Sequence, residues 1–257
     1  MICRSQEGKM YKIFEDKYIE IMPKLISEGF KPLTFEQICK LRLEDNSYFD
    51  KWLDTCSMIV YHPNGKFKIV NDSELLKSVN KDTNLVDGAI GLTEKEYKNI
   101  KSKEFSREGL KFNECLTKEE VLSHPIWNAL ITNKKLLKDY THYVFNHVDG
   151  KNMSVGISSP DKILARAWFM NRLNYGSGAD GRFIRDGLGG RLVGYSDGVA
   201  EKEKADYSGF TIKQIKENIE SKILKDLDLN DIFLYECIMK GELRKIQKKL
   251  RKWREKI

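Results

Sequence analysis

A glycine-rich segment in the last third of the chain most constrains the fold. Eight glycines lie between residues 175 and 198, interspersed with serine, aspartate and arginine. Each glycine costs a helix about 1 kcal/mol relative to alanine, so this segment is not expected to form a long helix. The run Gly190-Arg-Leu-Val-Gly-Tyr195 predicts a short strand near its end. The segment is therefore expected to consist of compact loops that close on this strand.

Strands are also predicted upstream of the glycine-rich segment. Residues 151–157 and 163–173 have the composition of strands, and the second run is rich in aromatic side chains. A β-hairpin is predicted where 58–62 and 66–70 flank Pro63-Asn64-Gly65. Asn-Gly accepts the positive φ angles of a tight turn, which fixes the position of the hairpin.

Helices are predicted mainly from their N-terminal caps. In the capping-box pattern, a threonine and a Glu or Gln three residues later satisfy each other's backbone amides. The pattern begins at Thr34, Thr93, Thr117 and Thr211. Apolar spacing predicts a helix over 10–28 that Pro23 kinks or cuts, and proline is favoured as a first helical residue. The remaining expected elements are a helix from Pro125, a helix over 136–148 and a short strand within 85–92.

Together these elements predict an α+β fold in three parts. Residues 1–149 would form an α-rich N-terminal region with the hairpin at 58–70. Residues 150–200 would form a glycine-rich mixed module packed on that region, and 201–257 a helical, basic C-terminal extension. A length of 257 residues is compatible with one large domain or two smaller ones.

The net positive charge is concentrated in the C-terminal tail. Residues 240–257 contain nine Lys or Arg and two Glu, a net charge of +7, which equals that of the whole chain. Apolar residues from 232 to 257 alternate by three and four, which predicts a helix whose seam packs on another helix or a second chain. The opposite face of this helix is basic and could bind the phosphates of a nucleic acid. The candidate residues are Lys245, Lys248, Lys249, Arg251 and Lys252.

No motif nominates a catalytic site, a metal or a cofactor. Residues 176–181 match G-x-G-x-x-G, but a dinucleotide site needs a helix directly after the loop, and the next residues are too rich in glycine. The four histidines form no H-E-x-x-H motif, and the five cysteines form no C-x-x-C motif. A non-enzymatic protein is favoured; an enzyme whose residues assemble from distant positions stays an open alternative.

The cysteines and the apolar runs also bear on location. The five cysteines are odd in number and scattered, which predicts five free thiols. A membrane-spanning helix needs about 20 consecutive apolar residues, and the sequence has no such run and no apolar signal segment at its start. The chain is therefore expected in the cytoplasm, or in a virus particle assembled there.

One stretch of the sequence resembles a known family. It reads Ala165-Arg-Ala-Trp168-Phe-Met-Asn-Arg-Leu-Asn-Tyr-Gly-Ser-Gly-Ala-Asp-Gly181, and Gly190-Arg-Leu-Val-Gly194 follows. It is similar to the C-terminal part of the C-type-lectin-fold variable proteins, which are the targets of diversity-generating retroelements. In that family a strand that bears a tryptophan leads into loops that end on a short strand of this form. The resemblance covers residues 165–194 and implies that 150–200 is a C-type-lectin-like module.

The resemblance implies a scaffold and a ligand-binding surface within these residues. The scaffold positions would be Trp168, Leu173, Ala179, Gly181, Leu188, Arg191 and Val193. The exposed, ligand-facing positions would be Asn174, Tyr175, Ser177, Asp180, Arg182, Phe183, Arg185 and Asp186. Polar side chains with tyrosine make adaptable contacts, as in antibody paratopes. The partner would be a protein or another macromolecule, with no cofactor and no metal.

The sequence thus favours a non-enzymatic binding protein that presents a polar and aromatic surface, and that a retroelement diversifies. The alternative is a nucleic-acid-binding protein that uses its basic C-terminal helix. Steep salt dependence of binding would favour the alternative, whereas salt-insensitive binding that is lost on changing 174–186 would favour the lectin-like surface.

Overall fold

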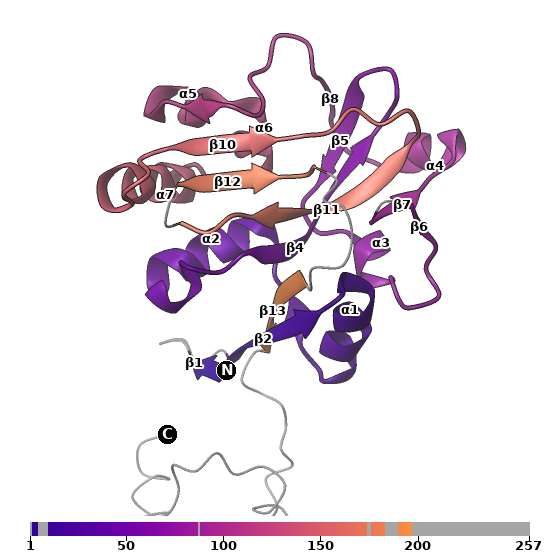
Figure 1. Ribbon diagram of the computed structural model, residues 1–257, viewed down its shortest axis with the longest axis horizontal. Coiled ribbons are helices and arrows are strands. Elements are labelled where there is room, and N and C mark those ends of the chain that lie inside the picture. The colour runs from indigo at the N-terminus through magenta and orange to yellow at the C-terminus, as the bar shows by residue number, and fades with distance from the viewer. Residues whose placement is uncertain (1, 5–9, 87, 174–175, 183–189, 197–257) are drawn as a thin grey trace, which may run out of the picture. The chain divides into compact units, whose positions relative to one another are not determined.

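The computed structural model describes residues 2–4, 10–86, 88–173, 176–182 and 190–196, all within one unit that spans 1–200. Its helices are α1 (Tyr18–Ser27), α2 (Phe35–Glu44), α3 (Glu74–Lys77), α4 (Glu94–Asn99), α5 (Lys118–Ser123), α6 (Pro125–Leu130) and α7 (Lys134–His147), with a 3₁₀ turn at Asn46–Tyr48. Figure 1 shows these helices around a central sheet.

The described strands form one mixed sheet. They are β1 (Ile2–Arg4), β2 (Met10–Asp16), β3 (Lys31–Pro32), β4 (Leu53–Tyr61), β5 (Lys66–Val70), β6 (Leu85–Val86), β7 (Ala89–Gly91), β8 (Glu104–Ser106), β9 (Cys115–Leu116), β10 (Met153–Gly156), β11 (Leu164–Met170), β12 (Ser177–Asp180) and β13 (Gly190–Ser196). The main path runs β1-β2-β13-β4-β11-β12-β10-β9, and the other strands branch from it.

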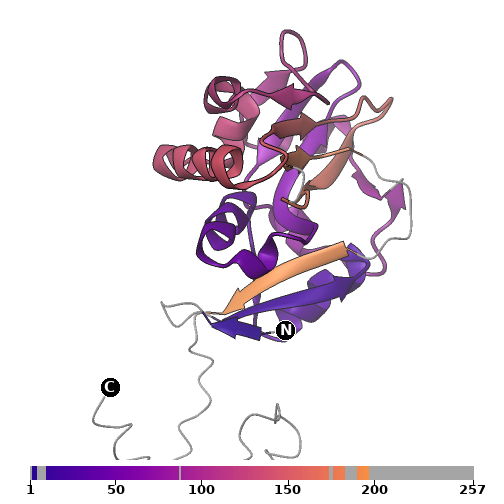
Figure 2. The ribbon, with the colours of Figure 1, turned by 60° about the vertical axis from the view of Figure 1, so that its left-hand side comes forward.

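The sheet joins the two predicted parts of the described unit. β4 precedes residue 149 and pairs with β11, which follows it; β2 likewise pairs with β13. The predicted boundary between residues 149 and 150 therefore passes through a single sheet. Figure 2 shows β2 and β13, the first long strand and the last described strand, lying side by side.

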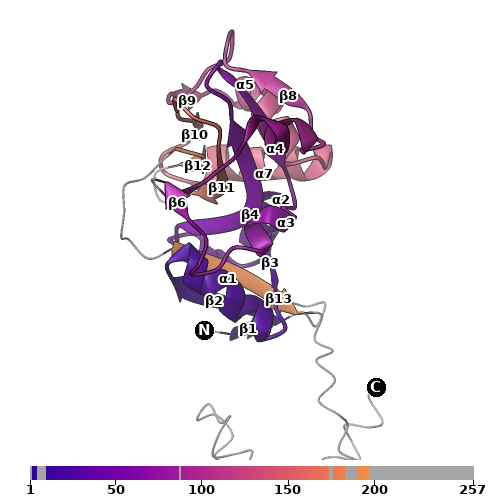
Figure 3. The ribbon, with the colours of Figure 1, turned by 90° about the vertical axis from the view of Figure 1, so that its right-hand side faces the viewer.

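Two sets of helices cover the two faces of the sheet. On one face Leu53, Trp168 and Val193 share a core with α2, α5, α6 and α7. On the other face, Met58 and Ala167 pack with residues of α3 and α4, and Leu192 of β13 packs on α1. Figure 3 shows α3 and α4 beside β4, and α1 beside β13. The core is thus divided by the sheet.

The helix predicted over 10–28 is wrong in its first half and confirmed in its second half. Residues 10–16 form β2, and only 18–27 are helical, as α1, with Pro23 inside the helix. β2 pairs with β13 over seven residues and with β1 on its other side. β13 thus pairs with β2 over its whole length, and β1 pairs with residues 10–12 on the other side. Long-range contacts therefore decide the structure of a segment whose apolar spacing also fits a helix.

The hairpin is confirmed. β4 and β5 are antiparallel, with Met58 opposite Val70 and Tyr61 opposite Phe67. Gly65 has φ of +83° and closes the turn by donating its N–H to the carbonyl of His62 at 3.1 Å. Within the Asn64-Gly65 turn only Gly65 has a positive φ angle, and a side chain at this position would strain the backbone.

The capping boxes at Thr34, Thr93 and Thr117 are confirmed, at the starts of α2, α4 and α5. Pro125 begins α6, and the helix predicted over 136–148 is α7. Residues 85–92 contain two short strands, β6 and β7, in place of one. The helices predicted from Thr211 and over 232–257 lie outside the described residues.

The strands predicted around the glycine-rich segment are confirmed as β10, β11 and β13. β12 was expected as loop; it is a strand that lies between β10 and β11. Cys39, Cys56 and Cys115 are free thiols, as predicted for them. No helix among the described residues is long and apolar enough to cross a membrane.

Candidate functional site

The structure describes three of the eight predicted ligand-facing residues. Ser177 and Asp180 lie at the two ends of β12, and Arg182 follows that strand. The other five, Asn174, Tyr175, Phe183, Arg185 and Asp186, lie outside the described residues. So do the residues of the alternative nucleic-acid surface, Lys245, Lys248, Lys249, Arg251 and Lys252. The candidate site is therefore built from the residues that lead into and out of 174–175 and 183–189.

The predicted exposure of Ser177 and Asp180 is wrong. Their exposed fractions are 1% and 2%. β12 lies inside the sheet, between β10 and β11, so both of its edges are paired, and all four of its residues are buried. The Ser177 hydroxyl exchanges a hydrogen bond of 2.9 Å with the buried Tyr140 hydroxyl. These two side chains belong to the scaffold.

Arg182 is exposed, as predicted, and pairs with Asp180. Half of its side chain is accessible, whereas the Asp180 side chain is 3% exposed. Arg182 donates its backbone N–H to Asp180 Oδ1 at 2.8 Å and its Nε–H to Oδ2 at 2.9 Å. The buried carboxylate thus fixes both the backbone and the guanidinium at the residue where the chain leaves β12.

A second carboxylate fixes the chain where it returns to the sheet. Arg191, on β13, donates its backbone N–H to Oδ2 of Asp54 on β4 at 3.1 Å. Its Nε–H binds Glu15 on β2 at 2.6 Å. A side chain at Gly190 would meet Asp54 Oδ2 at 2.4 Å, so only glycine leaves room for this carboxylate. Asp180 and Asp54 therefore hold the two ends of residues 182–191, which include four of the eight predicted binding residues.

The environment of Asp54 disfavours its charge. Burial raises the pKa of this carboxyl to about 6, although the Arg191 N–H and the positive charge of Arg166 act to lower it. Asp54 keeps partial access to a small cavity of about 70 Å³, which Tyr18 and Arg166 also line. The same burial lowers the pKa of the Arg166 guanidinium. The site therefore holds a carboxylate that is costly to ionise at neutral pH.

A pH dependence of stability follows from Asp54. Its pKa in the folded state lies above the unfolded value near 3.9, so the folded state binds the proton more tightly. This contribution stabilises the protein as pH falls from about 7 towards 4 and is lost as pH rises through 6. Its upper limit is about 3 kcal/mol, reduced by the partial solvent access.

The stability of the Asp54→Asn variant relative to the unmodified protein should therefore increase as pH is raised from 4.5 to 7.5. Urea unfolding of both proteins at several pH values measures the difference, in which the titration of all other groups cancels. A difference that does not change with pH would show that Asp54 titrates as an ordinary surface carboxyl.

A buried arginine fixes the other loop, which contains Asn174 and Tyr175. Arg42 of α2 has no exposed surface. Its Nη2 donates to the carbonyls of Lys51 at 2.8 Å and Asn171 at 2.9 Å, and its Nη1 donates to the Tyr140 hydroxyl at 3.3 Å. One guanidinium thus joins α2, α7 and the residues that follow β11.

Backbone hydrogen bonds hold this loop on both sides. Leu173 donates its N–H to the carbonyl of Phe49 at 2.8 Å, and Gly176 donates to the carbonyl of Leu173 at 3.0 Å. Asn171 donates to the carbonyl of Gly178 at 3.2 Å. The residues before and after 174–175 are therefore tied to each other and to the rest of the fold.

The G-x-G-x-x-G match serves packing. Gly176 has φ of +122°, and a side chain there would meet the Asn152 carbonyl at 2.6 Å. A side chain at Gly181 would meet the Tyr61 hydroxyl at 2.9 Å, and this hydroxyl donates to the Gly181 carbonyl at 2.8 Å. The motif spans strand β12, whereas a dinucleotide-binding motif of this form is a loop that leads into a helix.

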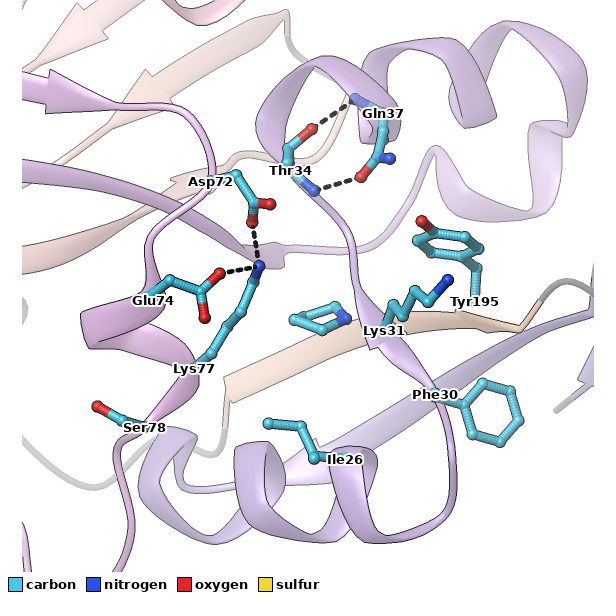
Figure 4. A pocket seen from close by; sticks show the side chains of 11 residues that line it. Ile26, Phe30, Lys31, Thr34, Gln37, Asp72, Glu74, Lys77, Ser78 and Tyr195 are labelled. Atoms are coloured by element: carbon cyan, nitrogen blue, oxygen red, sulfur yellow. Dashed lines mark hydrogen bonds and ion pairs between the residues drawn. The ribbon is translucent and has the colours of Figure 1, made fainter. Parts of the chain in front are cut away.

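A larger pocket lies elsewhere, between α1, α3, β3 and the end of β13 (Figure 4). Its volume is about 450 Å³. Three of its charged groups satisfy each other, because Lys77 bridges Asp72 at 2.7 Å and Glu74 at 2.8 Å. Thr34 and Gln37 are likewise engaged in the capping box of α2. None of the predicted binding residues lines it.

The buried contacts of the candidate site hold the chain at 171, 182 and 191, next to 174–175 and 183–189. The described residues contain no group of three or more His, Cys, Asp or Glu side chains that could bind a metal. Asp54 and Arg42 were not predicted from the sequence, because neither lies in residues 165–194 and both act through contacts distant in sequence. A charged residue between apolar neighbours, as Arg42 is between Leu41 and Leu43, was the available signal.

Comparison with known proteins gives one structural relative and no sequence family. No family model matches the chain, and no curated protein matches it. The structure is similar to a solved structure with the description "Accommodation of massive sequence variation in Nanoarchaeota by the C-type lectin fold". The TM-score is 0.57 at 18% sequence identity, over 73% of this chain and 98% of that chain. This chain therefore has the C-type lectin fold, which confirms the resemblance found in residues 165–194.

Proposed function

We propose that this chain is a non-enzymatic binding protein that presents side chains of residues 174–186 on a C-type-lectin scaffold. We further propose that a retroelement diversifies this segment. One observation carries the proposal: buried side chains fix the chain on both sides of 174–175 and of 183–189. Surface side chains can then change while the backbone that carries them keeps its anchors. The protein of similar fold is described as accommodating massive sequence variation.

The burial of two candidate residues narrows the proposed set of variable positions. Ser177 and Asp180 are buried and hydrogen-bonded, so changing them would cost stability. Arg182 is exposed but neutralises Asp180. The proposed variable set is therefore Asn174, Tyr175, Phe183, Arg185 and Asp186. A reverse transcriptase gene beside a near-copy of the codons for 165–194 would be the genomic sign of diversification.

A display library tests whether the scaffold tolerates variation at these five positions. We expect most members of a library randomised at 174, 175, 183, 185 and 186 to keep the protease resistance of the parent. Substitutions at surface positions usually change stability by no more than about 0.5 kcal/mol. Yeast display followed by trypsin and chymotrypsin treatment measures this for each clone.

The control is a library of equal size in the buried scaffold, randomised at Ser177, Ala179, Leu192 and Val193. Most of its members should lose resistance, since core substitutions cost several kcal/mol. Equal loss in both libraries would show that residues 174–186 are part of the core and would refute the proposed surface. Clones of the first library that bind a chosen target, such as streptavidin, would show directly that the surface can take a ligand.

The second candidate function rests on the charge of residues 240–257, which carry the whole net charge of +7. If this segment binds nucleic acid, retention on heparin or DNA should fall steeply with salt. Changing Lys245, Lys248, Lys249 and Arg251 to Glu should abolish it. If the substituted protein is retained on heparin or DNA as strongly as the unmodified protein, residues 240–257 do not bind nucleic acid through these side chains.

A further inference from the structure

One large aromatic side chain lies exposed beside the proposed binding segment. Trp52 immediately precedes β4, and 48% of its surface is accessible. The other tryptophans of the described residues, Trp127 and Trp168, are completely buried. Isolated exposed apolar residues need no explanation, so Trp52 acquires meaning only from its neighbours.

The neighbour that matters is Arg172. Its guanidinium lies over the Trp52 ring, 5.4 Å from the ring centroid. The two residues meet because Leu53 of β4 pairs with Met170 of β11, so the residues just beyond this pair lie at the same end of the two strands. Within the part of the chain that the structure describes, no carboxylate pairs with Arg172. The stack therefore offers an aromatic surface and a cation that keeps its hydrogen-bond donors.

This pair is held in place by the same contacts that hold the first loop. Arg42 binds the carbonyls of Lys51 and Asn171, which are the residues directly before Trp52 and Arg172. Asn174 follows Arg172 by two residues. The orientation of the stack is therefore fixed relative to Leu173, the last described residue before the proposed variable segment.

Further aromatic side chains border the same loop. Phe49, whose carbonyl binds the Leu173 N–H, lies 5.3 Å from the ring of Tyr143 on α7. Tyr143 in turn lies 5.1 Å from His147, which is exposed. Aromatic residues and arginine are the types that dominate the energy of protein interfaces.

We propose that Trp52 and Arg172 form an invariant anchor of the binding surface, and that they take an acidic segment of a polypeptide. This proposal rests on the proposed function and deepens it. A carboxylate of the partner pairs with the free edge of the Arg172 guanidinium, in the bidentate geometry that arginine favours. An apolar or aromatic side chain next to that carboxylate covers the accessible part of Trp52. The variable positions that follow then add specificity to a contact that every variant shares.

A peptide library tests the anchor. Random dodecapeptides displayed on phage are selected on the full chain, and the binders are resynthesised to measure their Kd. We expect the selected peptides to be enriched in Asp or Glu next to an apolar or aromatic residue. Trp52→Ala and Arg172→Ala should each weaken binding more than tenfold, because tryptophan and arginine anchors carry most of the binding energy of an interface.

Two controls separate recognition from folding. Arg172→Lys keeps the charge and loses the planar fork, so its Kd should lie between those of the unmodified protein and Arg172→Ala. Val86→Ala removes another exposed apolar side chain, at the opposite end of β11, and should leave Kd unchanged. Thermal unfolding should stay unchanged for all of these variants, since the side chains are exposed.

The outcomes distinguish this inference from the proposed function. Binding that survives Trp52→Ala and Arg172→Ala, but is lost on changing Asn174, Tyr175 and Phe183 to alanine, would overturn the anchor and leave the proposed function standing. Binding lost in Trp52→Ala but retained in the three-alanine variant would support the anchor and count against the variable segment. Selection of binders without a carboxylate, or of no binder at all, would refute the acidic polypeptide as the ligand.

Discussion

Replacing Arg42 by methionine is expected to destabilise the protein, because two backbone carbonyls lose their donor at a cost of about 1–3 kcal/mol each. Methionine fills a similar volume but donates no hydrogen bond. The carbonyls of Lys51 and Asn171 would then lose their Nη2 donor inside the protein. Because both carbonyls belong to the loops at the candidate site, the variant should also loosen those loops.

Two measurements check this prediction. Urea unfolding gives the free energy of unfolding, and hydrogen exchange should show faster exchange of the Leu173 and Gly176 amides. Lys40→Ala is the matched control on the same helix. Lys40 is exposed, and its 3.5 Å pair with Glu44 is an i,i+4 helix pair worth about 0.3–0.5 kcal/mol. An Arg42→Met variant as stable as Lys40→Ala would contradict the anchoring role.

Local patterns predicted much of the fold. The capping boxes at Thr34, Thr93 and Thr117 located three helices, because a cap acts within four residues and needs no distant partner. The Asn64-Gly65 turn located the hairpin for the same reason. These signals lie on neighbouring residues, and the rest of the protein does not have to be known to interpret them.

Long-range pairing accounts for the errors. β2 has apolar residues that fit a helix as well as a strand, and its partner β13 lies almost 180 residues away in the sequence. β12 was expected as loop because three glycines lie at 176, 178 and 181, yet the strands on both sides leave room only for such small residues. Its burial also explains why Ser177 and Asp180 were wrongly assigned to the surface.

In the candidate site, too, local patterns were predicted and long-range contacts were not. The stretch 165–194 indicated the family of folds, since it contains the buried strand, the glycines that pack against it and the closing strand. The anchors, Asp54 and Arg42, lie more than 100 residues before the loops they hold. Under the proposed function, the side chains that vary lie between these anchors.

Replacing Trp168 by alanine is expected to unfold the protein or to reduce its stability by about 3–5 kcal/mol. Trp168 has no exposed surface and lies at an irregularity in the pairing of β11 with β4. Its carbonyl accepts a hydrogen bond of 2.7 Å from the Thr55 hydroxyl, and its ring contacts the place where a side chain at Gly181 would lie. The cavity left by the indole would separate β11 from the chain that leaves β12.

The contrasting variant changes Asn174, Tyr175, Phe183 and Arg185 to alanine together. It should unfold at nearly the temperature of the unmodified protein, because each surface change costs no more than about 0.5 kcal/mol. Arg182 is deliberately kept, since its loss would leave the buried Asp180 carboxylate without its guanidinium partner. Arg182→Ala alone should therefore destabilise, and adding Asp180→Asn should restore part of the loss. Collapse of the four-alanine variant would place these side chains in the core, and a stable Trp168→Ala protein would remove the scaffold on which the binding surface is proposed to rest.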